Sequence, residues 1–520
     1  MLDRIMLSIC GNARTEMAVT WRFRAPDFVP GSEAFALLRP IESAAWVRVE
    51  AVTAEIATDE SIHTHAWARF CGLAPGKRYA YTVGSINVRS IEYIFCTEPE
   101  NLAEFDFLLI SDQQRSQPWE NPSYDAPRRM IDKMLSAYPD IRFILTAGDN
   151  CDNGQNEIQW NAMFGGFNGI IESLPHMMCT GNHDNRGFAQ YLPSPAGKFY
   201  LDHADLFDAQ FERCYPQNGP VGFRGENYSF DYGDAHFTIM GINAPQTVAD
   251  WAYADIQGSN KRWKLGCYHF PIYPLMPEGQ NDDAYPWLRR PIEEGSLDVL
   301  FSGHEHSFGR TYPMRGEEMG DKPSEGFVNY ICGATGGGVY ISNARKMWHA
   351  AFYPQEINLP MAHLVHVTRD TLTVTAVLAD GRIADEFILD KARDAIHPVA
   401  LAPTYLKTKL SYKGDMVNFG GRGVFPFCRD GIWMVPAAVL LGHIGGAVQK
   451  SPGSVSVAAY KKEAVFAEGV DGCVRGDKGE LYVPANTLCR IFGMKWQYAA
   501  RNNILNFDHP SEDKAFPQQM

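Results

Sequence analysis

The sequence predicts a multidomain protein with an N-terminal β-sandwich, a central α/β domain and a small duplicated α+β domain at the C-terminus. Three observations predict this organisation: alternating patterns over the first hundred residues, strand-helix-strand patterns from about residue 101, and an internal repeat in the tail. We expect domains at residues 1–100, 101–395 and 396–520, because 520 residues suit about three domains of roughly 150 residues each.

Short alternating runs in the first hundred residues predict antiparallel strands. They are residues 17–21, 46–49, 65–70 and 79–83. Residues 73–79 resemble the turn into a strand of a fibronectin type III sandwich, in which a tyrosine hydroxyl bonds back to the chain. We therefore expect Tyr79 to form a tyrosine corner in a sandwich that carries no catalytic groups.

Five short apolar runs in the middle of the chain each end at residues that bind metals. The runs are residues 105–110, 141–145, 174–179, 263–267 and 299–301, and the residues that follow them include Asp112, Asp149, Asn182, His269, His304 and His306. Short apolar runs that end in Gly or Asp predict buried strands. Open α/β sheets form their sites just beyond the carboxyl ends of their strands. The pattern therefore predicts a two-metal hydrolase site.

Two further patterns define the central domain. Met130, Met134, Leu135 and Tyr138 recur at helical spacing after Ala126-Pro127, which predicts a helix between two parallel strands. The glycine-rich residues 334–338 lack the lysine and the helix start of a phosphate-binding P-loop, so we expect a tight turn there.

The order and spelling of the five metal segments resemble the metallophosphoesterase superfamily. The closing segment, Gly303-His304-Glu305-His306 through Tyr312-Pro313, resembles its purple-acid-phosphatase-like branch in particular. The resemblance covers residues 2–392 and implies a four-layer fold of two packed mixed sheets flanked by helices. It also implies hydrolysis of phosphate monoesters or diesters through a dinuclear metal site and a metal-bound hydroxide.

The resemblance also assigns the site residues. It implies that Asp149 bridges the two metals, with Asp112 and His306 on the first and Asn182, His269 and His304 on the second. His183 is then expected to contact a phosphate oxygen or protonate the leaving group, with Asp184 fixing its tautomer. For Arg310 two roles stay open: a bidentate contact to phosphate, or an ion pair with an acid such as Glu305.

Two positions depart from the family pattern. Gln114 stands where many members have histidine, and Asp152 stands where purple acid phosphatases have tyrosine, so no Fe(III)–phenolate colour is expected. Oxygen ligands favour harder ions, so Gln114 as a ligand would move the first metal toward Mn²⁺, Mg²⁺ or Fe²⁺. We expect two divalent ions from among Fe, Mn and Zn. Cys151 and Cys267 lie inside the metal segments, where packing is favoured over ligation.

The tail contains a repeat at an offset of 48 residues. Residues 434–437 match residues 482–485, and each copy predicts a strand, a Val-Pro turn, an apolar helix, a glycine cap and a strand. The repeat resembles the duplicated copper-amine-oxidase N-terminal-like stalk domain of bacterial surface proteins. That resemblance implies an accessory or attachment domain without copper chemistry, and His443 alone forms no metal site.

Composition limits the partners. A net charge of −14 without a basic cluster disfavours nucleic acid, and no apolar run approaches the ~20 residues of a membrane span. The charged N-terminus does not suit a signal peptide, and eleven scattered cysteines suit a reducing compartment. These features favour the cytoplasm, whereas the stalk resemblance favours the cell surface.

Two functions stay open from the sequence. The first is a phosphoesterase acting on small-molecule phosphate esters, with substrate loops at residues 114–123, 186–205 and 275–285 and with Trp119, Tyr124 and Tyr285 as candidate walls. The alternative is a degenerate metallophosphoesterase that binds phosphate or metal as a surface or adhesion protein. The complete set of ligands together with His183 favours the enzyme.

Overall fold

The computed structural model describes residues 2–24, 33–114, 122–185, 204–242, 245–275, 288–316, 318–336, 338, 348–352, 359–401, 408–417, 424–476, 478–499 and 504–510. The chain divides into two compact units. The first comprises Met1–Pro274, Gly279–Tyr340 and Leu359–Ala400, and the second comprises Leu275–Glu278, Ile341–Asn358 and Leu401–Met520. The first unit contains both the N-terminal strands and the central sheets, so their boundary near residue 100 stays a prediction.

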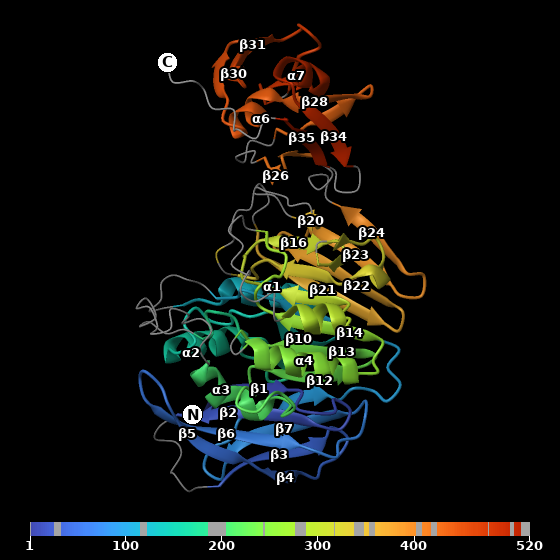
Figure 1. The fold of residues 1–520 in the computed structure, drawn as a ribbon. Helices are drawn as coiled ribbons and strands as arrows, with labels where there is room; N and C mark the ends of the chain where they lie inside the picture. Colours follow the sequence, from blue (N-terminus) through green and yellow to red (C-terminus); the bar gives the residue numbers. More distant parts are fainter. Residues whose placement is uncertain are drawn as a thin grey trace. The chain divides into compact units, whose positions relative to one another are not determined.

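The N-terminal strands form two four-stranded antiparallel sheets, ordered β1-β2-β6-β5 and β4-β3-β7-β8 (Figure 1). Their bounds are β1 (Leu2–Ser8), β2 (Met17–Phe23), β3 (Ala34–Pro40), β4 (Val47–Glu50), β5 (Val52–Ala57), β6 (Ile62–Phe70), β7 (Arg78–Ser85) and β8 (Tyr93–Cys96). Trp21, Phe70 and Tyr81 fill the core between them. The backbone N–H of Ala74 donates to the Tyr79 hydroxyl at 2.8 Å, which is the predicted tyrosine corner.

The central part of the first unit contains two large mixed sheets. The first sheet is ordered β11-β10-β9-β21-β22-β23-β24, and the first-unit strands of the second are ordered β12-β13-β14-β15-β19-β16. The first consists of β9 (Glu104–Ile110), β10 (Ile141–Thr146), β11 (His176–Met178), β21 (Met361–Thr368), β22 (Thr371–Leu378), β23 (Ile383–Asp390) and β24 (Ala395–Leu401). The second consists of β12 (Tyr228–Tyr232), β13 (Ala235–Met240), β14 (Trp263–Tyr268), β15 (Val299–Ser302), β16 (Phe308–Thr311) and β19 (Val328–Cys332), and β17 (Met314–Arg315) pairs with β18 (Glu318–Met319) beside it.

The two sheets face each other through aromatic side chains. Phe107 of the first sheet meets Phe237 of the second edge-on, with ring centroids 5.4 Å apart, and Phe143 meets Phe230 at 5.7 Å. These strands are buried on both faces, which explains why they read as continuous apolar runs. The core of the unit therefore lies between the sheets, and it fixes which strand ends meet.

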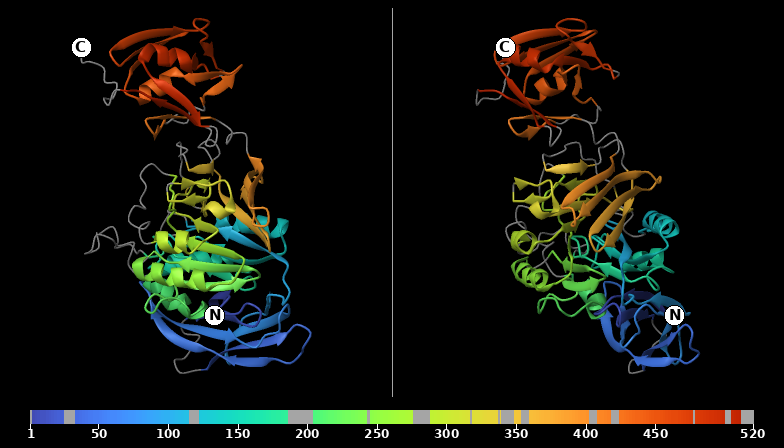
Figure 2. Two further views of the ribbon diagram at one scale, coloured as in Figure 1. Left: turned by 45° about the vertical axis from the view of Figure 1, so that its right-hand side comes forward. Right: turned by 90° about the vertical axis from the view of Figure 1, so that its right-hand side faces the viewer.

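The first unit also contains helices. They are α1 (Asp125–Ala137), α2 (Glu157–Phe167), α3 (Asp205–Phe211) and α4 (Pro245–Gly258), with short 3₁₀ turns η3 (Glu212–Cys214) and η5 (Pro323–Glu325) and a π-turn η4 (Arg290–Glu294). Helix α1 packs on β21 and α4 packs on β13, and the right-hand view of Figure 2 shows the teal and green helices on opposite sides of the sheets. Among the residues that the structure describes, no helix has the length and apolarity that crossing a membrane requires.

The parallel strands bring the predicted site together. Strands β9, β10 and β11 run parallel in the first sheet, and β13, β14, β15 and β19 run parallel in the second. Their carboxyl ends therefore lie along one edge of each sheet. All five apolar runs that the sequence analysis identified form strands, although β11 is limited to three residues.

The second unit contains the tail repeat. Its strands are β20 (His349–Phe352), β25 (Lys409–Tyr412), β26 (Asp415–Met416), β27 (Phe427–Arg429), β28 (Ile432–Pro436), β29 (Ala447–Ser451), β30 (Ser454–Ala459), β31 (Lys462–Ala467), β32 (Val474–Arg475), β33 (Leu481–Pro484), β34 (Lys495–Ala499) and β35 (Ile504–Asp508). The helices are α6 (Ala437–His443) and α7 (Ala485–Phe492), and each is followed by a left-handed glycine, Gly445 or Gly493. Strands β28 and β33 pair antiparallel about Val435 and Val483, which are equivalent positions of the two copies.

Candidate functional site

The strand ends place the predicted ligands in two groups that share one carboxylate. Asp112 follows β9, Asp149 follows β10, Asn182 follows β11, His269 follows β14, and His304 and His306 follow β15. One group contains Asp112, Asp149 and His306, and the other contains Asp149, His269 and His304. In each group the ligand atoms all lie within 4.8 Å of one another. The shared Asp149 corresponds to the bridging position that the sequence analysis assigned.

Asn182 lies in the second group. Its Oδ1 atom is 3.2 Å from His269 Nε2 and 3.0 Å from His304 Nδ1. The Nε2 atom of His269 is also 3.2 Å from Asp149 Oδ1. A carboxylate oxygen, an amide oxygen and two imidazole nitrogens therefore converge on one volume, and this donor set fits a divalent ion such as Zn²⁺, Mn²⁺ or Fe²⁺.

The backbone of the site is strained at the ligands themselves. Asp112, Asp149, His304 and His306 all have positive φ angles, of 47°, 54°, 69° and 46°. Residues other than glycine rarely adopt this left-handed backbone region, because it costs about 1–3 kcal/mol for each residue. The surrounding packing must therefore hold these residues, and such strain is concentrated at functional sites.

Ligand orientation is fixed by contacts behind the site. The Nδ1 atom of His269 is 2.8 Å from the Ala147 carbonyl oxygen, and Nδ1 of His306 contacts the Gly338 carbonyl oxygen. The carboxylate of Asp112 accepts hydrogen bonds from Ser111 Oγ at 2.7 Å and from the His304 amide at 3.0 Å. A histidine bound through one nitrogen in this way presents the other nitrogen to a metal.

The electrostatics of the groups favour cations. Burial alone would raise the pKa of Asp149, but the charges of His269 and His183 lower it. Burial alone would lower the pKa of His269, and the neighbouring Asp149 charge instead raises it to about 10. Burial and the charge of His269 lower the pKa of His304 to about 3. Asp149 is therefore ionised and His304 neutral, the forms in which these side chains bind metals, whereas His269 is protonated and must release its proton to bind one.

Gln114 lies at the first group. Its Nε2 atom is 3.3 Å from Asp149 Oδ2 and 3.3 Å from His306 Nε2, and the side chain is buried. Rotation of the amide by half a turn exchanges its nitrogen and oxygen, which would direct Oε1 at the same atoms. Gln114 therefore lies beside the group of Asp112, Asp149 and His306, and its coordination of a metal stays a prediction.

His183 is oriented by Asp152 rather than by Asp184. The Nδ1 atom of His183 is 3.0 Å from Asp152 Oδ1 and 2.9 Å from the Asp152 carbonyl oxygen. The Asp184 carboxylate instead accepts hydrogen bonds from the amides of Asn150, Cys151 and Gly181. Burial and the charge of Asp149 raise the pKa of Asp184 to about 7. The expectation that Asp184 fixes His183 is corrected: Asp184 shapes the loop, and Asp152 contacts the imidazole.

Arg310 takes the second of the two roles that the sequence left open, an ion pair with an acid, but the acid is Asp385 and not Glu305. Its Nε atom is 2.7 Å from Asp385 Oδ2, its Nη2 atom is 3.2 Å from Asp385 Oδ1, and its guanidinium lies over the Phe387 ring. Both ion-pair partners are buried. The guanidinium is thus held by a bidentate pair between the sheets instead of by Glu305 or a phosphate. Sequence reasoning missed Asp385 because 75 positions separate the partners.

The remaining candidates act in packing or lie outside the described residues. Tyr124 is buried, and its hydroxyl donates to the Asn150 carbonyl oxygen at 2.6 Å. It therefore supports the loop that carries Asp149 instead of lining a substrate site. Trp119 and Tyr285 lie outside the described residues. Cys151 and Cys267 are buried, and burial raises the pKa of the Cys151 thiol, as expected for small packing residues.

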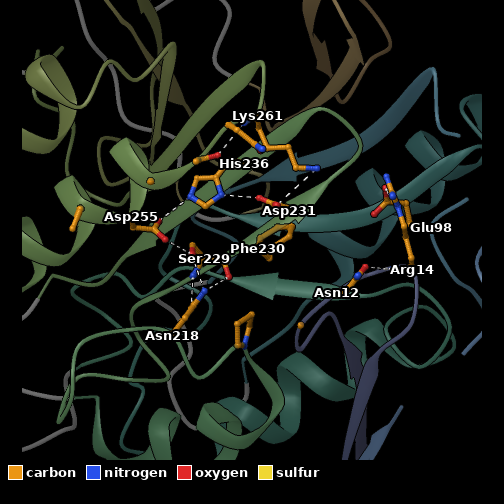
Figure 3. Close-up of a pocket in the computed structure, with 16 residues that line it drawn as sticks. Asn12, Arg14, Glu98, Asn218, Ser229, Phe230, Asp231, His236, Asp255 and Lys261 are labelled. Atoms are coloured by element: carbon orange, nitrogen blue, oxygen red, sulfur yellow. Dashed lines mark hydrogen bonds and ion pairs between the residues drawn. The ribbon is translucent and has the colours of Figure 1, made fainter. Parts of the chain in front are cut away.

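A separate cavity of about 670 Å³ lies against β12, β13 and α4 (Figure 3). Its central feature is His236, whose Nδ1 is 2.7 Å from Asp231 Oδ1 and whose Nε2 is 2.9 Å from Asp255 Oδ2. On another side of the cavity, Arg14 pairs with Glu98 at 3.1 Å. None of the ligands above lines this cavity, and these charged groups pair with one another.

Three acid phosphatase sequences are similar to part of this chain. Purple acid phosphatase 21 of Arabidopsis thaliana is 22% identical over 46% of the chain, and the match spans about half of that relative, 52% of its length. Acid phosphatase type 7 of Mus musculus is 23% identical over 74% of the chain and 90% of its own length. A third, Probable inactive purple acid phosphatase 1 of Arabidopsis thaliana, is 21% identical over 61% of the chain and 56% of its own length.

The fold is also found in a solved structure. The purple acid phosphatase PPD1 from yellow lupin (Lupinus luteus) seeds superposes with a TM-score of 0.63 at 16% identity, over 76% of this chain and 75% of its own. The family model of the calcineurin-like phosphoesterases matches residues 105–308, which include all five strand ends described above and reach the first residue of β16. The chain therefore contains a calcineurin-like metallophosphoesterase domain, with purple acid phosphatases among its relatives.

Proposed function

We propose that this protein hydrolyses phosphate esters, either monoesters or diesters, with two divalent metal ions held at the candidate site. The observation that carries the proposal is the pair of ligand groups that share Asp149, with His183 beside them. The Nε2 atom of His183 is 3.8 Å from Asp149 Oδ2, so the imidazole faces the shared carboxylate. Two ligand groups joined by one carboxylate suit the in-line displacement that phosphoesterases perform.

Each residue has a role in this proposal. Asp112, Asp149 and His306, with Gln114 as a candidate, would hold the first ion, and Asp149, Asn182, His269 and His304 would hold the second. Bound ions would supply Lewis acidity toward the phosphate oxygens and lower the pKa of a coordinated water. His183 directs Nε2 at the substrate, where it donates a hydrogen bond to a phosphate oxygen or a proton to the leaving group. Asp152 holds Nδ1 and so keeps the ring in that orientation.

A second candidate is a degenerate member that binds phosphate or metal without turnover. It is favoured by Gln114, which supplies an amide where many members have an imidazole, and by the relative that is named as probably inactive. The enzyme is favoured because both ligand groups and His183 are retained together. A site released from selection for catalysis has no reason to keep His183 oriented beside the shared carboxylate.

The deciding experiment combines metal analysis with two substrates. We expect two equivalents of metal and turnover of p-nitrophenyl phosphate or of its bis-ester when Mn²⁺ is added. Asp149→Asn should abolish turnover, whereas Asp140→Asn, an exposed aspartate just before β10, serves as the matched control. Full occupancy of both positions without turnover of either ester would instead support the binding protein.

A further inference from the structure

Side chains of the N-terminal sandwich bind the first residue of helix α2 through hydrogen bonds. Glu157 is only 4% exposed, although it begins a helix in another layer of the unit. Its carboxylate accepts hydrogen bonds from four sandwich side chains. They are Arg22 Nη1 at 2.7 Å and His63 Nε2 at 2.8 Å on Oε1, with Thr58 Oγ1 at 2.5 Å and Ser61 Oγ at 3.0 Å on Oε2.

A second sandwich residue caps the same helix. Asp59, in the turn between β5 and β6, accepts hydrogen bonds from the Glu157 amide at 2.7 Å and from Asn156 Nδ2 at 2.7 Å. The first amides of a helix have no partner within the helix, so a carboxylate from elsewhere satisfies them and complements the helix dipole. Asp59 provides this cap across the boundary between the sandwich and the central sheets.

The Glu157 contact is ionic. Burial alone would raise the pKa of Glu157, but the hydrogen bond from Thr58 and the charge of Arg22 outweigh it and lower the pKa to about 2. Arg22 itself is fully buried and also pairs with Asp3 at 2.7 Å. Removal of one partner from a buried pair leaves the other charge without compensation, so the geometry of such a pair is tightly held.

Helix α2 in turn holds the loop that contacts His183. The Gln159 side-chain oxygen accepts a hydrogen bond from the Asp152 amide at 3.3 Å, and the Trp160 indole donates to the Gly154 carbonyl oxygen at 2.8 Å. The Gly154 amide donates to the His183 carbonyl oxygen at 2.8 Å. A continuous set of contacts therefore runs from the sandwich through the first turn of α2 to the backbone and side chain of His183.

We infer that Asp59 and Glu157 are positioning residues, through which the N-terminal sandwich sets the orientation of His183. The role in turnover rests on the proposed function, because His183 matters to the rate only if the site hydrolyses phosphate esters. Misplacement of a catalytic group by about 1 Å can cost 10²-fold in rate. A change at the sandwich should therefore lower kcat while leaving the metal ligands in place.

The test uses the full chain and an exposed residue. Asp59→Ala removes the cap from the surface, where the fold should tolerate the change, and Glu60→Ala, the exposed neighbour in the same turn, is the matched control. We expect Asp59→Ala to lower kcat for p-nitrophenyl phosphate about 10-fold, with metal content unchanged and KM within about 2-fold. Glu157→Gln should lower kcat further, provided that its melting curve shows a folded protein.

A second readout separates this inference from the proposed function. Nitrogen-15 NMR of labelled histidine reports the hydrogen bonding of the His183 ring, with the signal assigned by its loss in His183→Gln. We expect the signal to shift in Asp59→Ala and to stay in place in Glu60→Ala, whether or not the wild type turns over an ester. A wild type without turnover would refute the proposed function alone. The inference would be overturned if the His183 signal were the same in Asp59→Ala and Glu60→Ala. If the wild type is active, an equal kcat in the two variants would overturn it as well.

Discussion

Replacement of Gly181 by alanine tests the geometry of the shared carboxylate. Gly181 lies between β11 and the ligand Asn182, and its φ angle lies outside the left-handed region, so alanine meets no backbone strain there. A Cβ atom at this position would instead lie 2.2 Å from Asp149 Oδ1 and 2.5 Å from the Asp149 amide nitrogen. The substitution therefore pushes directly on the carboxylate that both ligand groups share.

The size of the effect follows from the overlap. Ordinary van der Waals contact begins at 3.4 Å, so Asp149 or the Gly181 backbone must move by about 1 Å. Metal–ligand distances tolerate deviations of only about 0.2 Å, so a shift of this size removes at least one bond to a metal. We expect metal affinity to fall at least 10-fold and the hydrolysis rate about 100-fold, which corresponds to about 2.7 kcal/mol in the barrier.

The assay measures metal content after dialysis, the rate on p-nitrophenyl phosphate at saturating Mn²⁺, and the melting temperature. Gly165→Ala is the control, because Gly165 is exposed within α2 and its added Cβ meets nothing within 4 Å. It should leave metal content and rate unchanged and stabilise the helix slightly. If Gly181→Ala kept both metals and a rate within about 2-fold of wild type, Asp149 would not be the shared ligand that the geometry indicates.

Two further predictions concern the metal-ligand groups, and a third concerns His236 in the separate cavity. Asp149→Ala should lose both metals, whereas Asn182→Ala should weaken mainly the second; metal analysis that finds both sites filled in Asp149→Ala would contradict the bridge. Gln114→His should tighten Zn²⁺ or Fe²⁺ binding more than Mn²⁺ binding, because imidazole suits the former, and unchanged titrations for all three ions would remove Gln114 from the ligands. Burial alone would lower the pKa of His236, but the hydrogen bonds and charges of its two aspartate partners, shown in Figure 3, raise it to about 9. Because the pKa of His236 is raised in the folded protein, its protonation stabilises the fold fully at pH values below the unfolded pKa of about 6.5. That contribution, about 3 kcal/mol, is lost as the pH rises through about 9. The melting temperatures of wild type and His236→Gln should therefore converge between pH 6 and pH 9, and a constant gap would count against the charged His236.

The sequence by itself determined the features that repeat over a few residues. A buried strand has its own apolar run, so the strand before each ligand segment was predictable from Phe107 or Phe143 and their neighbours without any knowledge of the partner strand. The same is true of the tail, where Gly445 and Gly493 mark the ends of two equivalent helices. Parallel strands end at one edge, so the meeting of Asp112 with Asp149 followed from local patterns and a single rule of sheet topology.

Only the tertiary structure decided which distant side chains pair. From the sequence, Arg310 had two plausible partners, a phosphate or an acid such as Glu305. In the folded chain it pairs with Asp385 of the other central sheet. Asp184 stands next to His183 in the chain, yet the turn directs its carboxylate to backbone amides and brings Asp152 to the imidazole instead. An acidic first residue of a helix is ordinarily a surface feature, so nothing local marks Glu157 as buried against Arg22. Periodicity records which face of an element is apolar, whereas the partner of a buried charge depends on how separate elements pack, and that information lies in no short segment of the chain.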